Sequence, residues 1–180
     1  MKQPLEMSHE FLVEILDNQS VAIDATMGNG HDTLFLAQHA RKVYAFDIQE
    51  VAITQTQKRL DQAGYTNVKL IHAGHEEVDD YVMEEIAAAI FNLGYLPRAE
   101  KHIITKPQTT LLAIQKILAK LVSGGRIAIM VYYGHDGGQE EKDAVLELVS
   151  QLSQDHYTVM QYKPLNQIHT PPFLIMIEKK

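Results

Sequence analysis

The sequence predicts an α/β protein built on a doubly wound, mostly parallel sheet of seven strands with an antiparallel last strand. Three observations lead to this prediction. Five apolar segments of strand length alternate with segments of helical periodicity, as in parallel sheets covered by helices. A turn with two glycines at alternate positions follows the first of these segments. The last two apolar segments are joined by a loop with no room for a crossover helix, so they must pair antiparallel.

The first half of the chain is expected to form four strands and four helices. Short apolar runs predict strands over residues 21–24, 43–46, 68–71 and 86–91. Apolar residues at helical spacing predict helices over residues 8–16, 33–40, 50–63 and about 76–83. Ser8 is the expected N-cap of the first helix, and Gly64 is expected to end the third. The run 86–91 has no polar residue, which is typical of a strand buried on both faces.

The second half of the chain completes the alternation and then departs from it. A helix is expected over residues 109–122, a strand over 127–132 and a helix over 140–152. The closing strands are expected over residues 157–162 and 173–177. We find no internal repeat and no linker, so we expect one domain over residues 1–180.

Composition excludes several kinds of protein. The chain is 46% hydrophobic and 22% charged and has no cysteine, which excludes disulfides and thiolate metal sites. No apolar run reaches the roughly 18 residues that span a bilayer, and no signal-peptide pattern follows the N-terminus. We therefore expect a cytoplasmic protein with no membrane partner. The net charge of −7 argues against bulk binding of nucleic acid, although a local basic patch could still hold one.

The glycine turn after the first strand is the centre of the predicted site. Glycines let a ligand approach the backbone, and the helix that follows offers free N–H groups. A dinucleotide-binding turn has a third glycine where this chain has Thr33. The pattern Asp24-x-Thr26-x-Gly28-x-Gly30 instead resembles that of class I methyltransferases, with Thr26 at the first glycine position. The antiparallel last strand is typical of the same fold. The expected cofactor is therefore S-adenosylmethionine, with S-adenosylhomocysteine as product.

Each part of this cofactor has a candidate partner. Asp24 suits the ammonium group, and backbone N–H groups near Asn29 and Gly30 suit the carboxylate. Asp47, at the end of the second strand, is placed to accept both ribose hydroxyls, and Ile48 offers an apolar surface to the adenine. The alternative is that the two aspartates are strand-end caps and the glycines only shape a turn. The expected cofactor contacts are Asp24, Thr26, Met27, Gly28, Asn29, Gly30, Asp32, Thr33, Asp47, Ile48, Gln49, Gly74, His75 and Asn92.

A turn with two histidines follows the third strand. In this fold the turn covers the adenine, so His75 and the backbone of Gly74 are candidates for its edge. No carboxylate lies at a spacing that is diagnostic of a metal site, so no metal is expected. The alternative is a pair of surface histidines in a loop.

The loop Asn92-Leu93-Gly94-Tyr95-Leu96-Pro97 follows the buried fourth strand and should lie in the crevice at the carboxyl ends of the strands. Amino-group methyltransferases have here an Asn or Asp that accepts hydrogen bonds from the target amine, followed by prolines and an aromatic residue that stacks on the base. Asn92 and Tyr95 could act in this way. The alternative is a Gly-Pro turn with Tyr95 in the core.

The chain as a whole resembles a small bacterial family long labelled rRNA methylases. Four segments carry the resemblance, and together they span nearly the whole chain: residues 24–33, 92–97, 134–141 and 166–172. The resemblance implies conversion of 5-aminomethyl(-2-thio)uridine at the tRNA wobble position to its methylaminomethyl form. The first segment also resembles ribosomal cytosine-N4 methyltransferases. After Pro97 the family tends to have Gly-Gly-Asp-Lys, whereas this chain has Arg98-Ala99-Glu100-Lys101.

A primary amine must be neutral and aligned with the methyl group to react. We expect Asn92 to orient it, with Tyr95 stacking on the base and His135 on the substrate side or at the proton exit. The glycines around His135 favour a lid and a mobile loop equally. A basic cluster of Arg98, Lys101, His102 and Lys106 could contact phosphates, unless it is only a solvated surface. The expected substrate contacts are Tyr95, Arg98, Lys101, Lys106, Tyr133, His135, Asn166, Gln167 and Pro171.

Three functions remain open at this stage. The first is a tRNA wobble-uridine amine methyltransferase, whose substrate surface a second subunit of a homodimer could complete. The second is a methyltransferase of rRNA or of a small-molecule amine. The third is a nucleotide-binding protein that transfers no methyl group; stabilisation by NAD rather than by S-adenosylhomocysteine would identify it.

Overall fold

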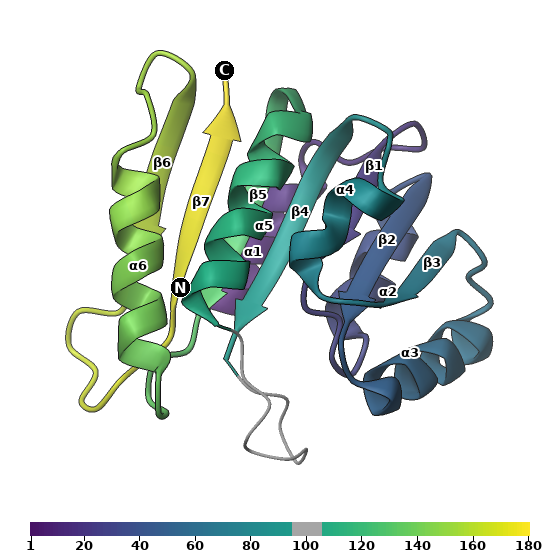
Figure 1. Ribbon diagram of the computed structural model, residues 1–180, viewed down its shortest axis with the longest axis horizontal. Coiled ribbons are helices and arrows are strands. Elements are labelled where there is room, and N and C mark those ends of the chain that lie inside the picture. The colour runs from purple at the N-terminus through teal and green to yellow at the C-terminus, as the bar shows by residue number, and fades with distance from the viewer. Residues whose placement is uncertain (95–105) are drawn as a thin grey trace.

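The computed structural model describes residues 1–94 and 106–180. Its seven strands form one sheet in the order β3-β2-β1-β4-β5-β7-β6 (Figure 1). The first five strands in this order pair in parallel, whereas β7 is antiparallel to both β5 and β6. This arrangement confirms the predicted fold class. The strands are β1 (Val21–Asp24), β2 (Lys42–Asp47), β3 (Val68–His72), β4 (Ile86–Leu93), β5 (Leu121–Val131), β6 (Tyr157–Tyr162) and β7 (Phe173–Lys179).

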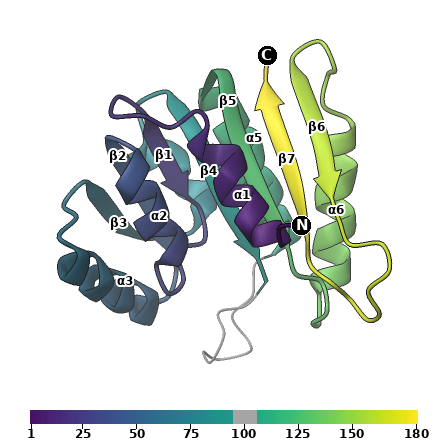
Figure 2. The same ribbon diagram turned by 180° about the vertical axis from the view of Figure 1, so that it is seen from behind.

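Helices cover both faces of the sheet. One face carries α1 (Pro4–Val13), α2 (His31–His39) and α3 (Glu50–Ala63), as Figure 2 shows. The other face carries α4 (Val78–Tyr81), α5 (Pro107–Lys120) and α6 (Gly138–Ser150), which lie in front in Figure 1. A 3₁₀ turn, η1 (His75–Glu77), precedes α4. No helix in the described part of the chain is long and apolar enough to cross a membrane.

β4 lies at the centre of the core and is buried on both faces, as its apolar run predicts. Ala88 and Ile90 pack on the same side as Leu12 of α1, whereas Phe91 packs on the side of α5 and α6. Successive side chains of a strand point to opposite faces. The alternation therefore directs Asn92, two residues after Ile90, toward the face that α1 and α2 cover.

The first helix begins at Pro4 rather than at Ser8. Proline is favourable in the first turn of a helix, because the N–H group that it lacks would have no helical partner. The backbone N–H of Gln3 donates to the Glu6 carboxylate at 3.0 Å, which satisfies one free donor at this end. Ser8 is a buried residue within the helix and not its cap.

The boundary between α5 and β5 also differs from the prediction. The strand begins at Leu121, inside the segment for which helical spacing predicts a helix over 109–122, and is longer than 127–132. Leu121 pairs with Ile86 of β4, and a register shift follows this pair. Gly124 has φ +76, a value that glycine adopts without strain. Because the start of β5 pairs irregularly, its apolar residues do not alternate as in a regular strand, and the sequence pattern does not reveal it.

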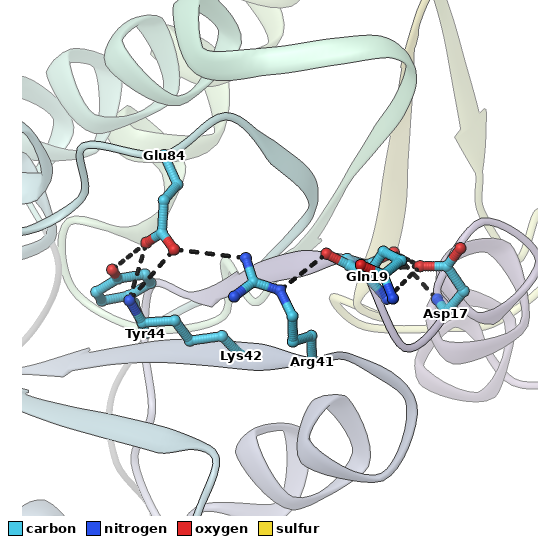
Figure 3. Close-up of polar contacts among 7 residues, drawn as sticks. Asp17, Gln19, Arg41, Lys42, Tyr44 and Glu84 are labelled. Atoms are coloured by element: carbon cyan, nitrogen blue, oxygen red, sulfur yellow. Dashed lines mark hydrogen bonds and ion pairs between the residues drawn. The ribbon is translucent and has the colours of Figure 1, made fainter.

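A polar network joins the amino ends of β1, β2 and β4 (Figure 3). The Glu84 carboxylate accepts hydrogen bonds from Lys42 Nζ at 3.0 Å, from Arg41 Nη2 at 3.5 Å and from the Tyr44 hydroxyl. Arg41 Nε also donates to the carbonyl oxygen of Gln19 at 3.2 Å. These contacts fix the edge of the sheet that lies opposite the carboxyl ends of the parallel strands.

Arg126 of β5 fastens α1 across the sheet. Its guanidinium forms ion pairs at 2.7 Å with Glu14, just after α1, and with Glu178 of β7. It also donates to the carbonyl oxygen of Phe11 at 2.7 Å and lies over the Phe11 ring, 4.6 Å from its centre. These contacts join α1 to two strands and so determine where the side chains of α1 lie.

Candidate active site

The candidate active site lies at the carboxyl ends of the parallel strands. It is centred on β1, which has β2 on one side and β4 on the other. This is the position at which open α/β sheets bind ligands. The turn after β1 is bonded to both neighbouring strands. Ala25 N donates to the carbonyl oxygen of Ile90 on β4, and Met27 N donates to that of Phe46 on β2, each at 2.9 Å.

The glycine turn requires its glycines for conformation and for space. Gly28 and Gly30 have φ values of +52 and +76, in the left-handed region. A Cβ atom on Gly30 would lie 2.6 Å from Thr56 Oγ1 of α3. Arg59 of α3 donates from Nε to the carbonyl oxygen of Asn29 at 2.9 Å. The turn is therefore closely packed against α3.

Asp24 is buried beneath this turn. Its Oδ2 accepts a hydrogen bond from Thr33 Oγ1 at 2.6 Å, and its Oδ1 accepts one from Thr26 N at 3.1 Å. Burial, with the charge of Asp32 as a second cause, raises the pKa of Asp24 to about 7. Both carboxylate oxygens therefore hold the turn together, as the cap interpretation of this residue expects.

Asp47 connects the glycine turn to the end of β2. Its Oδ2 accepts from Gly28 N and its Oδ1 from Gln49 N, both at 2.9 Å. Burial raises the pKa of this carboxyl group, and the two N–H groups oppose the shift. Asp47 is partly exposed, and the neighbouring residue Ile48 is 56% exposed. A carboxylate acceptor and an apolar surface thus lie side by side.

His75 lies deeper than expected for a residue at the edge of a ligand. Its Nδ1 is 3.0 Å from the carbonyl oxygen of Ala25, and its ring meets Phe91 edge-on at 5.7 Å. Burial lowers the pKa of this histidine, which favours a neutral ring that donates from Nδ1. Its Nε2 is buried and has no hydrogen-bond partner among the described residues. Before it, Gly74 is the extended residue that precedes η1, and His72 is a surface residue bonded to the Ile48 carbonyl.

Asn92, near the end of β4, is held by the glycine turn and by α2, which in turn contacts α1. Its backbone N–H donates to Thr26 Oγ1 of the glycine turn at 2.6 Å. Its side-chain Nδ2 donates to Asp32 Oδ2 of α2. The other oxygen of Asp32, Oδ1, lies 2.6 Å from His9 Nε2 of α1. The charge of Asp32 also contributes, after burial, to a raised pKa of Tyr132 at the end of β5. The sequence predicts neither His9 nor Tyr132 as part of this group.

The end of β5 brings together further predicted residues. Tyr133 packs edge-on against Phe173 at 5.8 Å, and Lys142 Nζ lies 5.1 Å from the centre of its ring. Tyr133 thus belongs to the α6 side, whereas Tyr132 is the tyrosine near Asp32. A Cβ atom on Gly94 would lie 3.6 Å from His135 Nε2, so the loops after β4 and β5 meet.

The remaining predicted substrate residues fall into two groups. Tyr95, Arg98, Lys101 and His102 lie outside the described residues. Lys106 is the exposed residue before α5, Asn166 and Gln167 are exposed, and Pro171 is partly buried. The loop that carries the last three reaches the loop after β5, because a Cβ atom on Gly134 would overlap Thr170 Oγ1.

Comparison with known proteins identifies the family. The sequence matches the family described as "Putative rRNA methylase" over residues 43–178. The chain belongs to this rRNA methylase family. A chloroplastic protein of Arabidopsis thaliana named tRNA (mnm(5)s(2)U34)-methyltransferase is 34% identical over 193 residues, which cover 99% of this chain and 70% of that protein.

Solved structures of similar proteins agree with this membership of the rRNA methylase family. A protein described as a putative methyltransferase from Streptococcus mutans, in complex with SAH, is 60% identical, with a TM-score of 0.96 over 100% of this chain and 99% of that one. A protein described as a putative rRNA methylase from Clostridium thermocellum is 40% identical, with a TM-score of 0.98 over 100% and 99% of the two chains. The protein is a class I methyltransferase that depends on S-adenosylmethionine.

The residues of the turn fit this cofactor. Gly30 adopts a left-handed conformation directly before α2, and the free N–H groups at the start of α2 favour a carboxylate. The carboxylate of the partly exposed Asp47 has oxygens that can accept from hydroxyl groups, and the exposed Ile48 lies beside it. This rRNA methylase family member thus has donors for an amino acid and acceptors for a ribose on adjacent strands.

Proposed function

We propose that the protein methylates the exocyclic aminomethyl nitrogen of the wobble uridine in tRNA, which converts 5-aminomethyl(-2-thio)uridine to the methylaminomethyl form. One observation carries the proposal. The amide of Asn92, at the edge of the sheet beside the cofactor turn, gives its NH₂ end to Asp32. Its oxygen is therefore the end that can accept an N–H group from an amine. The similarity to the Arabidopsis protein supports wobble uridine as the acceptor.

The reaction asks little of the protein beyond placement and removal of a proton. S-Adenosylmethionine, when bound, supplies a methyl group on a positively charged sulfur. An alkylamine has a pKa of about 10 in water, and burial near a positive charge lowers it, so the enzyme can bind the amine in its neutral form. A hydrogen bond from an N–H of the amine to Asn92 Oδ1 would then point the nitrogen lone pair away from Asn92. As the N–C bond forms and the S–C bond breaks, the nitrogen takes the positive charge and afterwards releases a proton.

The proposal assigns the cofactor to the turns after β1, β2 and β3. The amino-acid part is expected at the turn and the start of α2, with Asp24 acting by holding the turn. The ribose is expected at Asp47 and the adenine at Ile48. The residues proposed to contact or shape the cofactor site are Asp24, Thr26, Met27, Gly28, Asn29, Gly30, Asp32, Thr33, Asp47, Ile48, Gln49, Gly74, His75 and Asn92.

The proposal assigns the anticodon to the loops after β4, β5 and β6. A wobble base must leave its stack to be methylated, and an exposed aromatic residue can receive it. Tyr95 is proposed for this stacking, and His135, which meets the β4 loop at Gly94, for the substrate side. The residues proposed for the rest of the RNA surface are Arg98, Lys101, Lys106, Tyr133, Asn166, Gln167 and Pro171. One domain, a homodimer that completes the RNA surface and a cytoplasmic location are part of this proposal.

Mass spectrometry of nucleosides tests the acceptor. Transfer RNA that carries 5-aminomethyl-2-thiouridine is incubated with the protein and methyl-labelled S-adenosylmethionine, then digested. The expected result is label in 5-methylaminomethyl-2-thiouridine alone. Unlabelled wobble nucleoside would reject the proposal. Ribosomal RNA and small amines in parallel reactions test the alternative that the family description favours, in which rRNA is the acceptor.

A further inference from the structure

We propose that His9 of α1 is a positioning residue for methyl transfer: through Asp32 it holds the amide of Asn92 with its oxygen toward the acceptor amine. The inference rests on the proposed function, because it takes Asn92 as the group that orients the amine. It adds a residue from a helix that contributes none of the predicted contacts.

The position of the His9 side chain is well determined. Its ring stacks on that of Phe35 of α2, with centroids 4.0 Å apart and planes inclined by 3°. Its Nε2 lies 2.6 Å from Asp32 Oδ1, and 30% of the side chain is exposed. A carboxylate can only accept, so Nε2 carries the proton of this hydrogen bond. The stacking and the hydrogen bond together fix the ring in one orientation.

Asp32 passes this constraint to Asn92. One carboxylate oxygen is engaged by His9, and the other accepts from Asn92 Nδ2. An amide rotated by 180° would direct its oxygen at the carboxylate, and two acceptors repel each other. The carboxylate therefore selects the rotamer in which Asn92 Oδ1 faces away from Asp32. Without His9, the Asp32 side chain could turn and release this selection.

The fold supplies a reason for the position of His9 that is independent of the site. α1 is tied to β5 and β7 through Arg126, on the face toward which Asn92 points. A structural role for the pair is the competing explanation, since Asp32 is in the first turn of α2, where a negative charge is favourable. A structural role would alter stability but not the rotamer of Asn92.

Two substitutions separate these roles. His9→Phe keeps a ring that can stack on Phe35 but removes the donor, and His9→Gln keeps an N–H donor on a side chain of similar reach. The first readout is the side-chain amide of Asn92 in a ¹⁵N–¹H NMR spectrum, assigned by its loss in Asn92→Asp. The second is kcat for methylation of the tRNA nucleoside. The third is the Kd of S-adenosylhomocysteine by calorimetry.

The inference predicts a specific pattern. In His9→Phe the Asn92 amide signals should move and kcat should fall about tenfold or more, because a small misplacement of reacting groups is costly. The Kd of S-adenosylhomocysteine should change by a smaller factor than kcat, because Asp32 and Asn92 are only two of the residues proposed to shape the cofactor site. His9→Gln should restore both the signals and most of kcat. The dispersion of the same spectra reports whether each variant is folded.

Contrary results are equally clear. Wild-type kcat or unmoved Asn92 signals in His9→Phe would overturn the inference, and so would a failure of His9→Gln to restore them. If the wild type does not methylate the wobble nucleoside, the proposed function fails. The Asn92 signals still test the contact from His9 in that case, because they require no acceptor.

Discussion

Asp24 has no exposed surface, and both its carboxylate oxygens accept hydrogen bonds from the turn that follows it. Its pKa of about 7 in the folded protein lies well above the value of about 3.9 expected in an unfolded chain. The folded state therefore binds this proton more tightly than the unfolded state does. The resulting stabilisation is complete below the unfolded pKa and is lost as pH rises through the folded pKa.

This difference predicts how stability depends on pH. Between about pH 4 and pH 8 the wild type should lose a few kcal/mol of unfolding free energy that Asp24→Asn does not lose. Urea denaturation of both proteins at several pH values measures it. Parallel curves for the two proteins would show that Asp24 does not titrate in this range.

Gly30 and Gly64 form a matched pair for testing the turn. Both have φ +76, but a Cβ atom on Gly30 would meet Thr56, whereas one on Gly64 would meet nothing within 4 Å. Gly64→Ala should cost about 1 kcal/mol of stability from backbone strain alone and leave the Kd of S-adenosylhomocysteine unchanged. Gly30→Ala should cost more and weaken S-adenosylhomocysteine binding at least about tenfold. Denaturation and calorimetry measure both effects, and equal Kd values would contradict the proposed role of the turn.

The sequence is informative about some of these residues and silent about others. Asp47 and the glycines lie where strand ends and spacing place them, because both are local properties of the chain. The contact between His9 and Asp32 joins residues 23 positions apart, and that between Asp32 and Asn92 joins residues 60 apart. Such contacts depend on how α1 and α2 pack against the sheet, which periodicity within one helix does not determine.

At the scale of single elements, α1 depends on Arg126, whose side chain is 16% exposed. Arg126→Met should lower the unfolding free energy by about 1–3 kcal/mol, because it removes the donor from the Phe11 carbonyl and the cation from Glu14 and Glu178. Arg41 is the matched control: its side chain is 48% exposed and its ion pair with Glu84 spans 3.5 Å. Arg41→Met should cost less than about 0.5 kcal/mol. Urea denaturation measures both losses of unfolding free energy. Equal losses in the two variants would refute the role of Arg126 in holding α1.

Periodicity predicts most elements, and it fails where end effects dominate. The strand over residues 21–24 and the helix over 50–63 coincide with β1 and α3, and Gly64 ends α3 in the left-handed conformation, as predicted. The first helix begins earlier because Pro4 and the Gln3–Glu6 contact stabilise its start. β5 begins earlier because it pairs irregularly with β4. Capping contacts and strand pairing are not visible in the spacing of apolar residues.

On the scale of the whole molecule, the proposed function requires a chain with a net charge of −7 to bind RNA through a limited surface. Among the described cations, Lys163 lies near this surface, 5.8 Å from the Tyr133 ring and 5.5 Å from the Phe173 ring. Lys180 follows β7, at the end of the sheet opposite the carboxyl ends of the parallel strands, and donates to the Gln154 carbonyl. The two lysines allow the proposed RNA surface to be tested against the opposite end of the sheet.

Charge reversal at these positions tests the placement of tRNA. Lys163→Glu should weaken tRNA binding by about threefold to tenfold and lower the salt dependence of log K by about one. Lys180→Glu changes the net charge equally and should leave both quantities nearly unchanged. Filter binding across a salt series measures them. Equal effects of the two reversals would indicate that only net charge matters and would refute this surface.

Thr26 gives the site a thermodynamic property. Its hydroxyl oxygen accepts a hydrogen bond of 2.6 Å from the backbone N–H of Asn92. This bond joins the turn proposed to bind the cofactor to the residue proposed to orient the amine. A glycine, which the methyltransferase pattern has at this position, could not form it. Binding of the cofactor should therefore change the affinity for tRNA, and binding of tRNA should change the affinity for the cofactor by the same factor. In Thr26→Val, tRNA affinities measured with and without S-adenosylhomocysteine should become equal; an undiminished difference would place the communication between methyl donor and RNA elsewhere.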